Sequence, residues 1–324
     1  MKAACRIKMK RPPVLVIGEL NVDIVATGLR GSPEMGAEIL AQDCELTLGS
    51  ASAIFAVGMS KLDHKVTFVS QVGRDEFGDF CVAKLKQLGV ATSNVVRKAS
   101  EKTGVTLALS GKRDRALITY PGAIASLTAD HVNDRLLKKH DHVHLTSYYL
   151  QKGLQPRFGE IFQHAKALGL TTSFDPNSDP SDRWNSKINA VLKYTDVLFV
   201  NEREAIKLTK SKTVQAALKT LGAKVSCVVV KRGAKGAIAI RDNELFTDSG
   251  FRVKALDTTG AGDSFDAGFL SAYLMKQPPA ECLRFGNACG ALSAISIGGT
   301  AGQPTQAQLQ EFLGSKATRN RRTV

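Results

Sequence analysis

The sequence ALDTTGAGDSFDAGFLSAYL, residues 255–274, is the stretch that decides the fold. Its second half has apolar residues at helical spacing, so GAGD is expected on the turn where a helix begins. There the small residues Gly260, Ala261 and Gly262 let backbone N–H groups approach an anion, which the positive end of the helix dipole favours. Asp263 would lie in the first helical turn, where its carboxylate could take a proton from an attacking hydroxyl.

The GxGD pattern by itself also has a structural interpretation, an aspartate that caps a helix after a glycine-rich turn. Short motifs often match by chance, so this interpretation would be preferred for the four residues alone. The length of the full string and the elements around it favour the functional interpretation.

Several short apolar runs are each followed by small or polar residues and then by a helical pattern. These runs are VLVI before Gly18, TTSF before Asp175, VLFV before Asn201 and VVV before Lys231. Strands that alternate with helices predict an α/β fold with a parallel sheet covered on both faces. In such sheets ligands bind beyond the carboxyl ends of the strands, which is where these polar residues fall.

Two stretches depart from this alternation and predict a small β-lid. One spans roughly residues 24–49, and the other, residues 101–122, reads as a hairpin with a polar turn at SGKRDR. The sequence shows no repeat and no linker between independent domains. We therefore expect one domain over residues 13–313, with basic tails at 1–12 and 314–324.

The composition is that of a soluble globular protein, with 43% hydrophobic and 23% charged residues among 324. No apolar run is long enough to span a bilayer and the N-terminus lacks the apolar centre of a signal peptide, so we expect a cytoplasmic protein without a membrane partner. The six cysteines form no CxxC pair, which argues against a zinc site or disulfide framework. Much of the net charge of +14 lies in the two tails, so nucleic acid is not expected as a partner.

The string at residues 257–270 resembles the C-terminal signature of the ribokinase-like, or pfkB, carbohydrate kinases, and the resemblance extends over about residues 13–313. It implies a three-layer αβα ribokinase-like fold with a central, mostly parallel sheet and a β-lid. It also implies an ATP-dependent phosphotransferase that uses Mg²⁺ and has Asp263 as its catalytic base. The anion hole for the γ-phosphate would be formed by the backbone amides of Gly260, Ala261 and Gly262.

The same resemblance supplies candidate cation sites. NERE matches the N-x-x-E motif of the family, which places Asn201 at the ATP site and lets Glu204 hold Mg²⁺ through its waters. Without the resemblance, NERE would be interpreted as a helix start with Asn201 as N-cap. A monovalent cation such as K⁺ near Asp257 and Thr259 is a further expectation.

The nucleotide site is expected around VVVKRGAKGA, which resembles the nucleotide loop of the family. Lys231 takes the position that contacts phosphate, and Gly233 and Gly236 lie in the turn of an apparent hairpin, where backbone can approach a nucleotide. Asn287 matches a position that borders the adenine site. The structural alternative for the glycine-containing loop is a plain β-turn, and the alternative for Asn287 is a polar helix residue without a ligand.

The acceptor site is expected at GELNVD, just after the first strand. Asn21 and Asp23 alternate with Val22, so their side chains point the same way, and an amide with a carboxylate suits paired sugar hydroxyls. In the resemblance these two residues bind the substrate. Loop anchors closing the strand are the alternative.

The sequence LGSASAIFAVG departs from the family, which commonly has a Gly-Gly pair followed by an Asn that contacts sugar. It keeps Gly49 as a substrate-site residue but places Ser50 and Ile54 at the other two positions. An aliphatic side chain in place of the amide would leave a buried sugar hydroxyl without a partner, at a cost of about 1–3 kcal/mol. This departure therefore favours a deoxy sugar or a nucleoside as substrate more than the family average does.

Two other polar clusters receive no role. HDHVH places His140, His142 and His144 along one side of a possible strand, but no acidic or thiol partner is identifiable for a metal. Asp175 and Asn177 end a strand on the expected active-site side.

These patterns together predict a sugar kinase of the ribose, fructose or keto-deoxy-sugar class that forms a homodimer through its lid. A nucleoside kinase is the alternative within the same class of enzyme. The alternative from another class is a non-catalytic sugar- or nucleotide-sensing protein whose basic tails bind nucleic acid or a partner.

Overall fold

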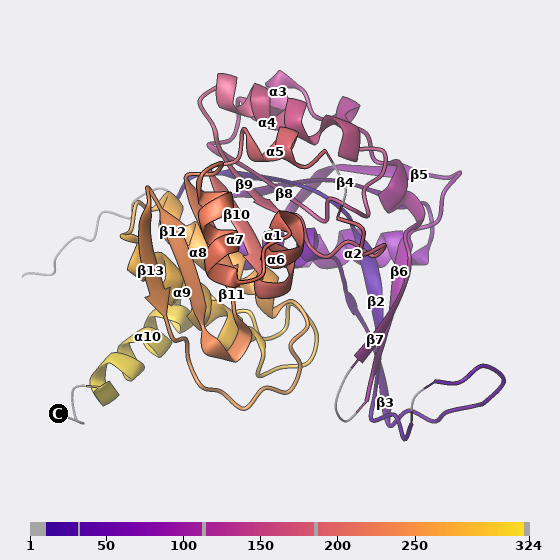
Figure 1. The fold of residues 1–324 in the computed structure, drawn as a ribbon. Helices are drawn as coiled ribbons and strands as arrows, with labels where there is room; N and C mark the ends of the chain where they lie inside the picture. The colour runs from indigo at the N-terminus through magenta and orange to yellow at the C-terminus, as the bar shows by residue number, and fades with distance from the viewer. Residues whose placement is uncertain (1–10, 32, 112–114, 185–186, 321–324) are drawn as a thin grey trace, which may run out of the picture.

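The central sheet has nine strands among the residues that the computed structural model describes, which are 11–31, 33–111, 115–184 and 187–320 (Figure 1). In spatial order they are β13 (Glu244–Asp248), β12 (Ala237–Arg241), β11 (Cys227–Lys231), β10 (Val197–Asn201), β9 (Thr171–Asp175), β8 (His142–Thr146), β1 (Val14–Ile17), β4 (Val66–Gly73) and β5 (Ala91–Lys98). The strands from β11 to β5 run parallel, and β12 and β13 are antiparallel additions at one edge. The predicted sheet is confirmed.

Helices cover both faces of this sheet, and the alternation of side chains along β1 shows why. Leu15 and Ile17 pack into one apolar cluster, whereas Val14 and Val16 pack into another on the opposite face. Because both faces are buried, the strand is a continuous apolar run with no polar position. The fold is therefore a three-layer α/β fold, as predicted.

The helices divide between these two clusters. One layer contains α3 (Asp134–Leu137), α4 (Phe158–Ala167), α5 (Asn189–Leu192), α6 (Glu202–Thr209) and α7 (Val214–Gly222). The other contains α1 (Ala51–Lys61), α2 (Glu76–Gln87), α8 (Ala261–Leu274) and α9 (Pro279–Ser293), with α10 (Gln306–Asn320) packed on α9. Short 3₁₀ helices cover η1 (Gly122–Ser126), η2 (Ala129–His131), η3 (Gln155–Arg157) and η4 (Gly233–Lys235).

A second, four-stranded sheet projects from the domain and forms the lid (Figure 1). Its strands, in spatial order, are β3 (Asp43–Leu48), β2 (Asn21–Thr27), β6 (Gly104–Ser110) and β7 (Arg115–Tyr120). The β6–β7 pair is the hairpin that the sequence predicted, and β2 pairs parallel to β6. The lid begins at Asn21, three residues before the predicted boundary, so the two candidate substrate residues lie on a lid strand.

The ends of the domain differ from the predicted tails. Arg11 lies against the domain and donates a hydrogen bond to Ser271 Oγ, 2.9 Å away, and the carbonyl of Pro12 accepts one from His64. At the other end, α10 continues past residue 313 as far as Asn320. Residues 1–10 and 321–324 of the predicted tails lie outside the described residues. None of the described helices is both long and apolar enough to cross a membrane.

Candidate active site

The GAGD motif forms the turn that starts α8, as the sequence predicted. Gly260 is the N-cap residue with φ 69°, and Asp263 lies in the first turn. A Cβ on residue 260 would lie 2.8 Å from Gly299 Cα and 2.9 Å from Ile54 Cγ2. The positive φ and the close approach both require glycine there. Residues 260–262 are called the anion turn below.

Helix α1 lies alongside α8 and runs in the same direction. A Cβ on Gly260 would meet Ile54, and further along the two helices a Cβ on Gly58 would lie 2.8 Å from Ala267 Cβ. Both helices therefore begin at the same edge of the sheet. The start of α1 at Gly49 and Ser50 is thereby brought to the side of the molecule where α8 begins.

Asn21, Asp23 and Gly49 form one compact group. Asn21 Nδ2 donates to Asp23 Oδ1 at 2.9 Å and to Thr106 Oγ1 at 3.2 Å. A Cβ on residue 49 would lie 2.0 Å from Asp23 Oδ1 and 2.6 Å from Asn21 Nδ2. Gly49 is thus the residue that leaves room for the amide and carboxylate to lie side by side.

Ser50 and Ile54 have partners within the protein. Ser50 is the N-cap of α1, accepts a hydrogen bond from Ala53 N and donates one to Glu19 O at 2.5 Å. Ile54 is 3% exposed and packs against Gly260 and the loop at residue 299. Its side chain therefore supports the anion turn and presents little surface to a ligand.

Glu19 is a buried acid that the sequence analysis missed. Its Oε1 accepts hydrogen bonds from Ser147 Oγ at 2.7 Å and Ser52 N at 3.2 Å, and its Oε2 accepts one from Ser52 Oγ. This carboxylate joins the ends of β1 and β8 to the start of α1. The available signal was an acid placed directly after the buried strand, between Gly18 and Leu20.

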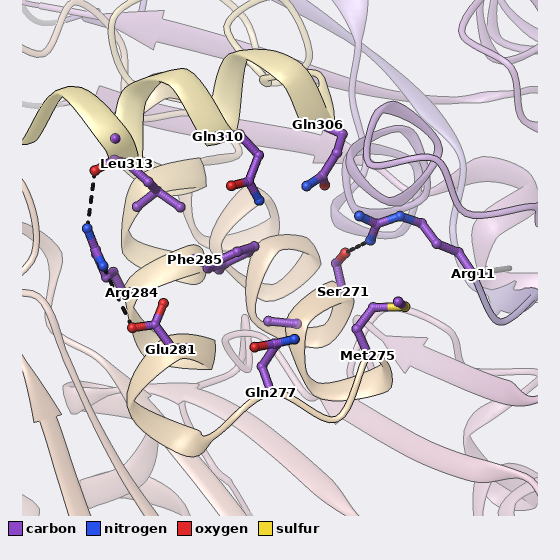
Figure 2. A pocket seen from close by; sticks show the side chains of 12 residues that line it. Arg11, Ser271, Met275, Gln277, Glu281, Arg284, Phe285, Gln306, Gln310 and Leu313 are labelled. Carbon is purple, nitrogen blue, oxygen red and sulfur yellow. Dashed lines mark hydrogen bonds and ion pairs between the residues drawn. The ribbon is translucent and has the colours of Figure 1, made fainter. Parts of the chain in front are cut away.

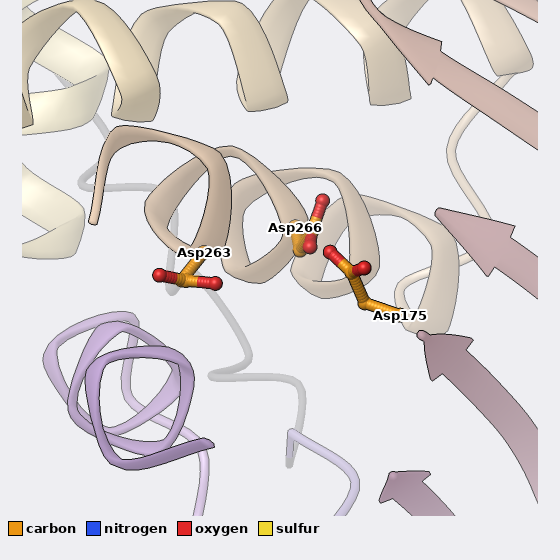
Figure 3. Close-up of side chains that lie close together, drawn as sticks. All are labelled: Asp175, Asp263 and Asp266. Atoms are coloured by element: carbon orange, nitrogen blue, oxygen red, sulfur yellow. The ribbon is translucent and has the colours of Figure 1, made fainter. Parts of the chain in front are cut away.

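A partly buried lysine lies among acids at the carboxyl ends of β9 and β11. Lys231 Nζ donates to Asp175 Oδ2 at 2.6 Å and to Asp266 Oδ2 at 2.9 Å. Figure 3 shows Asp175 at the end of its strand facing Asp266 on α8, with Asp263 one turn earlier on the helix. Asp266 was not predicted, and Asp175 had received no role. Together with Glu204, these three aspartates are called the acid cluster below.

The pKa values of Asp263, Asp266, Glu204 and Lys231 are shifted by burial and by the charges of neighbouring groups. Burial raises the pKa of Asp263, although the side chain keeps some solvent exposure. Lys231 opposes this rise, whereas Asp175, Glu19 and Glu204 add to it, and the resulting pKa is about 7. Burial likewise raises the pKa of Asp266 well above its usual value. Burial alone would lower the pKa of Lys231, but the surrounding carboxylates outweigh that effect and raise it.

Asn201 and Glu204 form a capping box at the start of α6. Glu204 N donates to Asn201 Oδ1 at 2.9 Å, and Asn201 N donates to Glu204 Oε2 at 2.8 Å. Burial raises the pKa of Glu204, and Asp175 adds to that shift. The helix cap, which was the alternative interpretation of NERE, is therefore present, and the Mg²⁺ role of Asn201 and Glu204 stays a prediction. The cluster fits such an ion, since its four carboxylates face one ammonium group among the described residues and Mg²⁺ prefers oxygen ligands.

The candidate nucleotide residues converge near the end of β13. Gly233 and Gly236 have φ 55° and 78° in the turn between β11 and β12, and a Cβ on residue 236 would lie 2.0 Å from Asp248 O. Asn287 Nδ2 donates to Asp248 Oδ1 at 2.6 Å. A Cβ on Gly250 would lie 3.0 Å from Gly236 Cα and 3.6 Å from Asn287 Cγ. The structure therefore brings together the predicted loop and the predicted adenine-site residue.

Asp257 joins two loops. Its Oδ1 accepts hydrogen bonds from Thr259 N and Oγ1 at 2.9 and 2.7 Å, and its Oδ2 accepts one from Gly298 N at 2.9 Å. These bonds account for the loop conformation, so the monovalent cation there stays a prediction.

The histidines of HDHVH are structural. The side chains of His142 and His144 each lie 2.7 Å from Ser173 Oγ, and His144 stacks on Phe55 with the ring centroids 3.6 Å apart. Burial lowers the pKa of His142 to about 3 and that of His144 well below its usual value, so both are neutral core residues. Asn177 is structural as well, since its Oδ1 accepts from Ser147 N at 2.9 Å.

Comparison with known proteins identifies the family, because a model of the pfkB family carbohydrate kinases matches residues 12–306. The chain belongs to the pfkB family of carbohydrate kinases. It is therefore a kinase, and ATP binding follows from the family.

Two pfkB relatives and one solved structure illustrate the range of the similarity. A fructokinase of Vibrio alginolyticus is 30% identical and covers 93% of this chain and 99% of its own. A 2-dehydro-3-deoxygluconokinase of Bacillus subtilis is 31% identical over 84% of this chain and 88% of its own. A putative ribokinase II of E. coli, solved with ATP and Mg²⁺, is 27% identical with a TM-score of 0.83, covering 94% of this chain and 99% of its own.

Figure 2 shows a cavity of about 480 Å³ beside the C-terminal half of α8, away from the GAGD turn at the start of that helix. Ser271 and Met275 line it, together with Arg11 and Phe285. Ser271 follows Asp263 by eight residues, which places it roughly 12 Å along the helix. None of the predicted site residues lines this cavity, so we do not assign the kinase reaction to it.

We expect Gly49→Ala to raise the KM for the acceptor while the KM for ATP changes little. The added Cβ would push apart Asn21 and Asp23, and a lost hydrogen bond to an acceptor hydroxyl corresponds to roughly a tenfold loss of affinity. Steady-state kinetics with each substrate varied in turn would measure this. Gly31→Ala is the matched control, because a Cβ there has no atom within 4 Å. An unchanged acceptor KM would argue against this substrate site.

Proposed function

We propose that this pfkB kinase transfers the γ-phosphate of ATP to a hydroxyl group of a sugar, with Asp263 as the general base. The observation that supports this most strongly is the position of Asp263 in the first turn of α8, directly after the anion turn. The turn supplies backbone N–H groups and the positive end of a helix dipole for the phosphoryl group. The carboxylate is then beside the group that the acceptor hydroxyl must attack.

The reaction would proceed in one proton transfer and one phosphoryl transfer. Asp263 accepts the proton of the sugar hydroxyl as its oxygen attacks the γ-phosphorus, and the bond to the β-phosphate oxygen breaks to give ADP. The amides of residues 260–262 stabilise the negative charge of the group in transfer. The Lys231 ammonium, close to Gly262, adds positive charge at the same place.

ATP would be held by the turn between β11 and β12 and by Asn287, which lie together near the end of β13. Mg²⁺, when bound, would neutralise phosphate charge, and Glu204 with Asn201 would hold it through water. Lid closure would exclude water from the site and so limit wasteful hydrolysis of ATP.

The acceptor that fits best is a sugar bound through paired hydroxyls by Asn21 and Asp23. Relatives named for fructose and for 2-dehydro-3-deoxygluconate indicate the class of compound to consider. The nucleoside alternative relied on an apolar contact with Ile54, but that side chain is buried against Gly260. We therefore favour a sugar or sugar acid over a nucleoside.

The decisive experiment is a panel of sugars, sugar acids and nucleosides assayed with ATP and Mg²⁺, followed by Asp263→Asn on the best substrate. General-base catalysis contributes about 10²–10⁴-fold, so kcat should fall by that factor while the melting temperature stays near the parent value. ATP affinity should hold or improve, because a carboxylate near the γ-phosphate has been removed. Normal kcat with a lower melting temperature would mean that Asp263 only caps the helix.

Turnover should depend on pH through the carboxyl of Asp263. Its raised pKa of about 7 means that the acid form, which cannot accept a proton, accumulates as the pH falls below that value. We expect kcat/KM, measured with both substrates well below saturation, to rise with pH and level off above neutrality. The residual activity of Asp263→Asn should lack this dependence. A parent profile that is flat through neutral pH would exclude this titration.

We also propose that the lid forms a homodimer with a second copy of this chain. Leu46, Ile24, Leu107 and Ile118 form one row across the four lid strands. Ile118 is 58% exposed and Leu46 43%, so the outer part of this row is an apolar surface open to water. Among the residues that the structure describes, the outer strands β3 and β7 also have one unpaired edge each.

The dimer should dissociate in Ile118→Glu, because a charge would be buried at the interface. Sedimentation velocity at micromolar concentration should show a dimer for the parent and a monomer for the variant, with similar melting temperatures. Leu245→Glu is the control, since Leu245 is 62% exposed on β13, outside the lid. A parent protein that is monomeric under these conditions would refute the lid dimer.

A further inference from the structure

Asp266 has no part in the mechanism described so far, although it lies one helical turn from the proposed base. It is 1% exposed, and its Oδ2 accepts a hydrogen bond from Lys231 Nζ at 2.9 Å. Positions 263 and 266 lie on the same face of α8, which brings Asp266 beside the end of β9 at Asp175. A buried acid in this place requires a physical reason, because burial of an unpaired carboxylate is unfavourable.

The geometry of Lys231 supplies that reason. A lysine ammonium has three N–H donors, and two of them go to Asp175 Oδ2 and Asp266 Oδ2. A Cβ on Gly262 would lie 3.3 Å from Lys231 Nζ, so the ammonium is adjacent to the anion turn. The third N–H is left for an acceptor on that side, where the γ-phosphate would bind.

We infer that Asp266 is a positioning residue, which holds the Lys231 ammonium beside the anion turn through a hydrogen bond so that its third N–H meets the γ-phosphate. The inference rests on the proposed function, because it requires the γ-phosphate at residues 260–262. Lysine has a long, flexible side chain, and without two fixed acceptors its ammonium would sample other positions. Fixed donors stabilise a transferring phosphoryl group better than donors that must first be ordered.

An asparagine at position 266 would keep the geometry that this arrangement needs. Its amide oxygen can accept from Lys231 Nζ as Asp266 Oδ2 does, and its amide N–H groups lie on the side of Asp175. An alanine at the same position offers Lys231 no acceptor.

Nucleotide binding tests the inference without a known sugar. The parent protein, Asp266→Ala and Asp266→Asn are titrated with the Mg²⁺ complexes of ADP and of the β,γ-imido analogue of ATP. We expect Asp266→Ala to lose roughly tenfold in its preference for the triphosphate over the diphosphate, since one charged hydrogen bond to the γ-phosphate is no longer ordered. Asp266→Asn should keep a preference close to that of the parent.

A double-mutant cycle with Lys231→Met shows whether Asp266 acts through the lysine. In the Lys231→Met background, Asp266→Ala should cause no further loss of the triphosphate preference. Ser271→Ala is the matched control: it removes from the same helix a side chain that accepts a part-buried hydrogen bond from Arg11, and it should leave the preference unchanged. If Asp266→Ala does not fold, as judged by thermal melting, Asp266→Leu makes the same comparison, because leucine also lacks an acceptor.

Three results would overturn the inference: an unchanged preference in Asp266→Ala, an equal loss in Asp266→Asn, or an equal loss with and without Lys231. Failure of the proposed function looks different. If the parent shows a triphosphate preference that depends on Asp266 but phosphorylates no acceptor, the kinase assignment of the site fails while the positioning role stands. If the parent binds neither nucleotide, both fail.

Discussion

The ion pairs of Lys231 are the interaction on which the proposed site depends. Its ammonium joins the end of β9 at Asp175 to the middle of α8 at Asp266, and so fixes the helix that carries Asp263 against the sheet. Replacing such buried charges with apolar groups often leaves stability unchanged or higher, so stability alone does not explain them. Their position explains them better, because the Lys231 ammonium and the proposed base Asp263 both lie next to residues 260–262, where phosphate would bind.

Much of the framework could be predicted from sequence because the constraints involved are local. Strands buried on both faces are apolar throughout, so the ends of β1, β10 and β11 could be predicted from the polar residues that follow each apolar run. The start of α8 was predicted correctly because a glycine-rich turn and an apolar helical face follow each other in the chain. Glu19 and Asp266 were missed because their partners are distant in sequence; Ser147 lies 128 residues from Glu19, and Lys231 lies 35 from Asp266.

The capping box at Asn201 shows why a motif has two valid interpretations. An amide and a carboxylate three residues apart satisfy the first N–H groups of a helix, and the same two oxygen-bearing groups suit a hydrated cation. The capping hydrogen bonds order both side chains before any ligand arrives, so the cap is compatible with the proposed cation site. From the sequence, the helix cap and the cation site were alternative interpretations of NERE. They do not exclude each other here, because α6 begins at the carboxyl end of β10, the edge of the sheet where ligands bind.

Glycines set how closely the parts of the site approach, and this explains the departure at Ile54. Residue 260 lacks a Cβ, so the branched side chain of Ile54 fills the space against the anion turn and against Gly299. A polar side chain buried at that position would need a hydrogen-bond partner, whereas isoleucine packs there without one. The proposed acceptor site then depends on the lid strand, where Asn21 and Asp23 lie against Gly49. The residues that would hold the sugar are therefore part of a lid strand. Closure of the lid would then move the same strand that binds the acceptor.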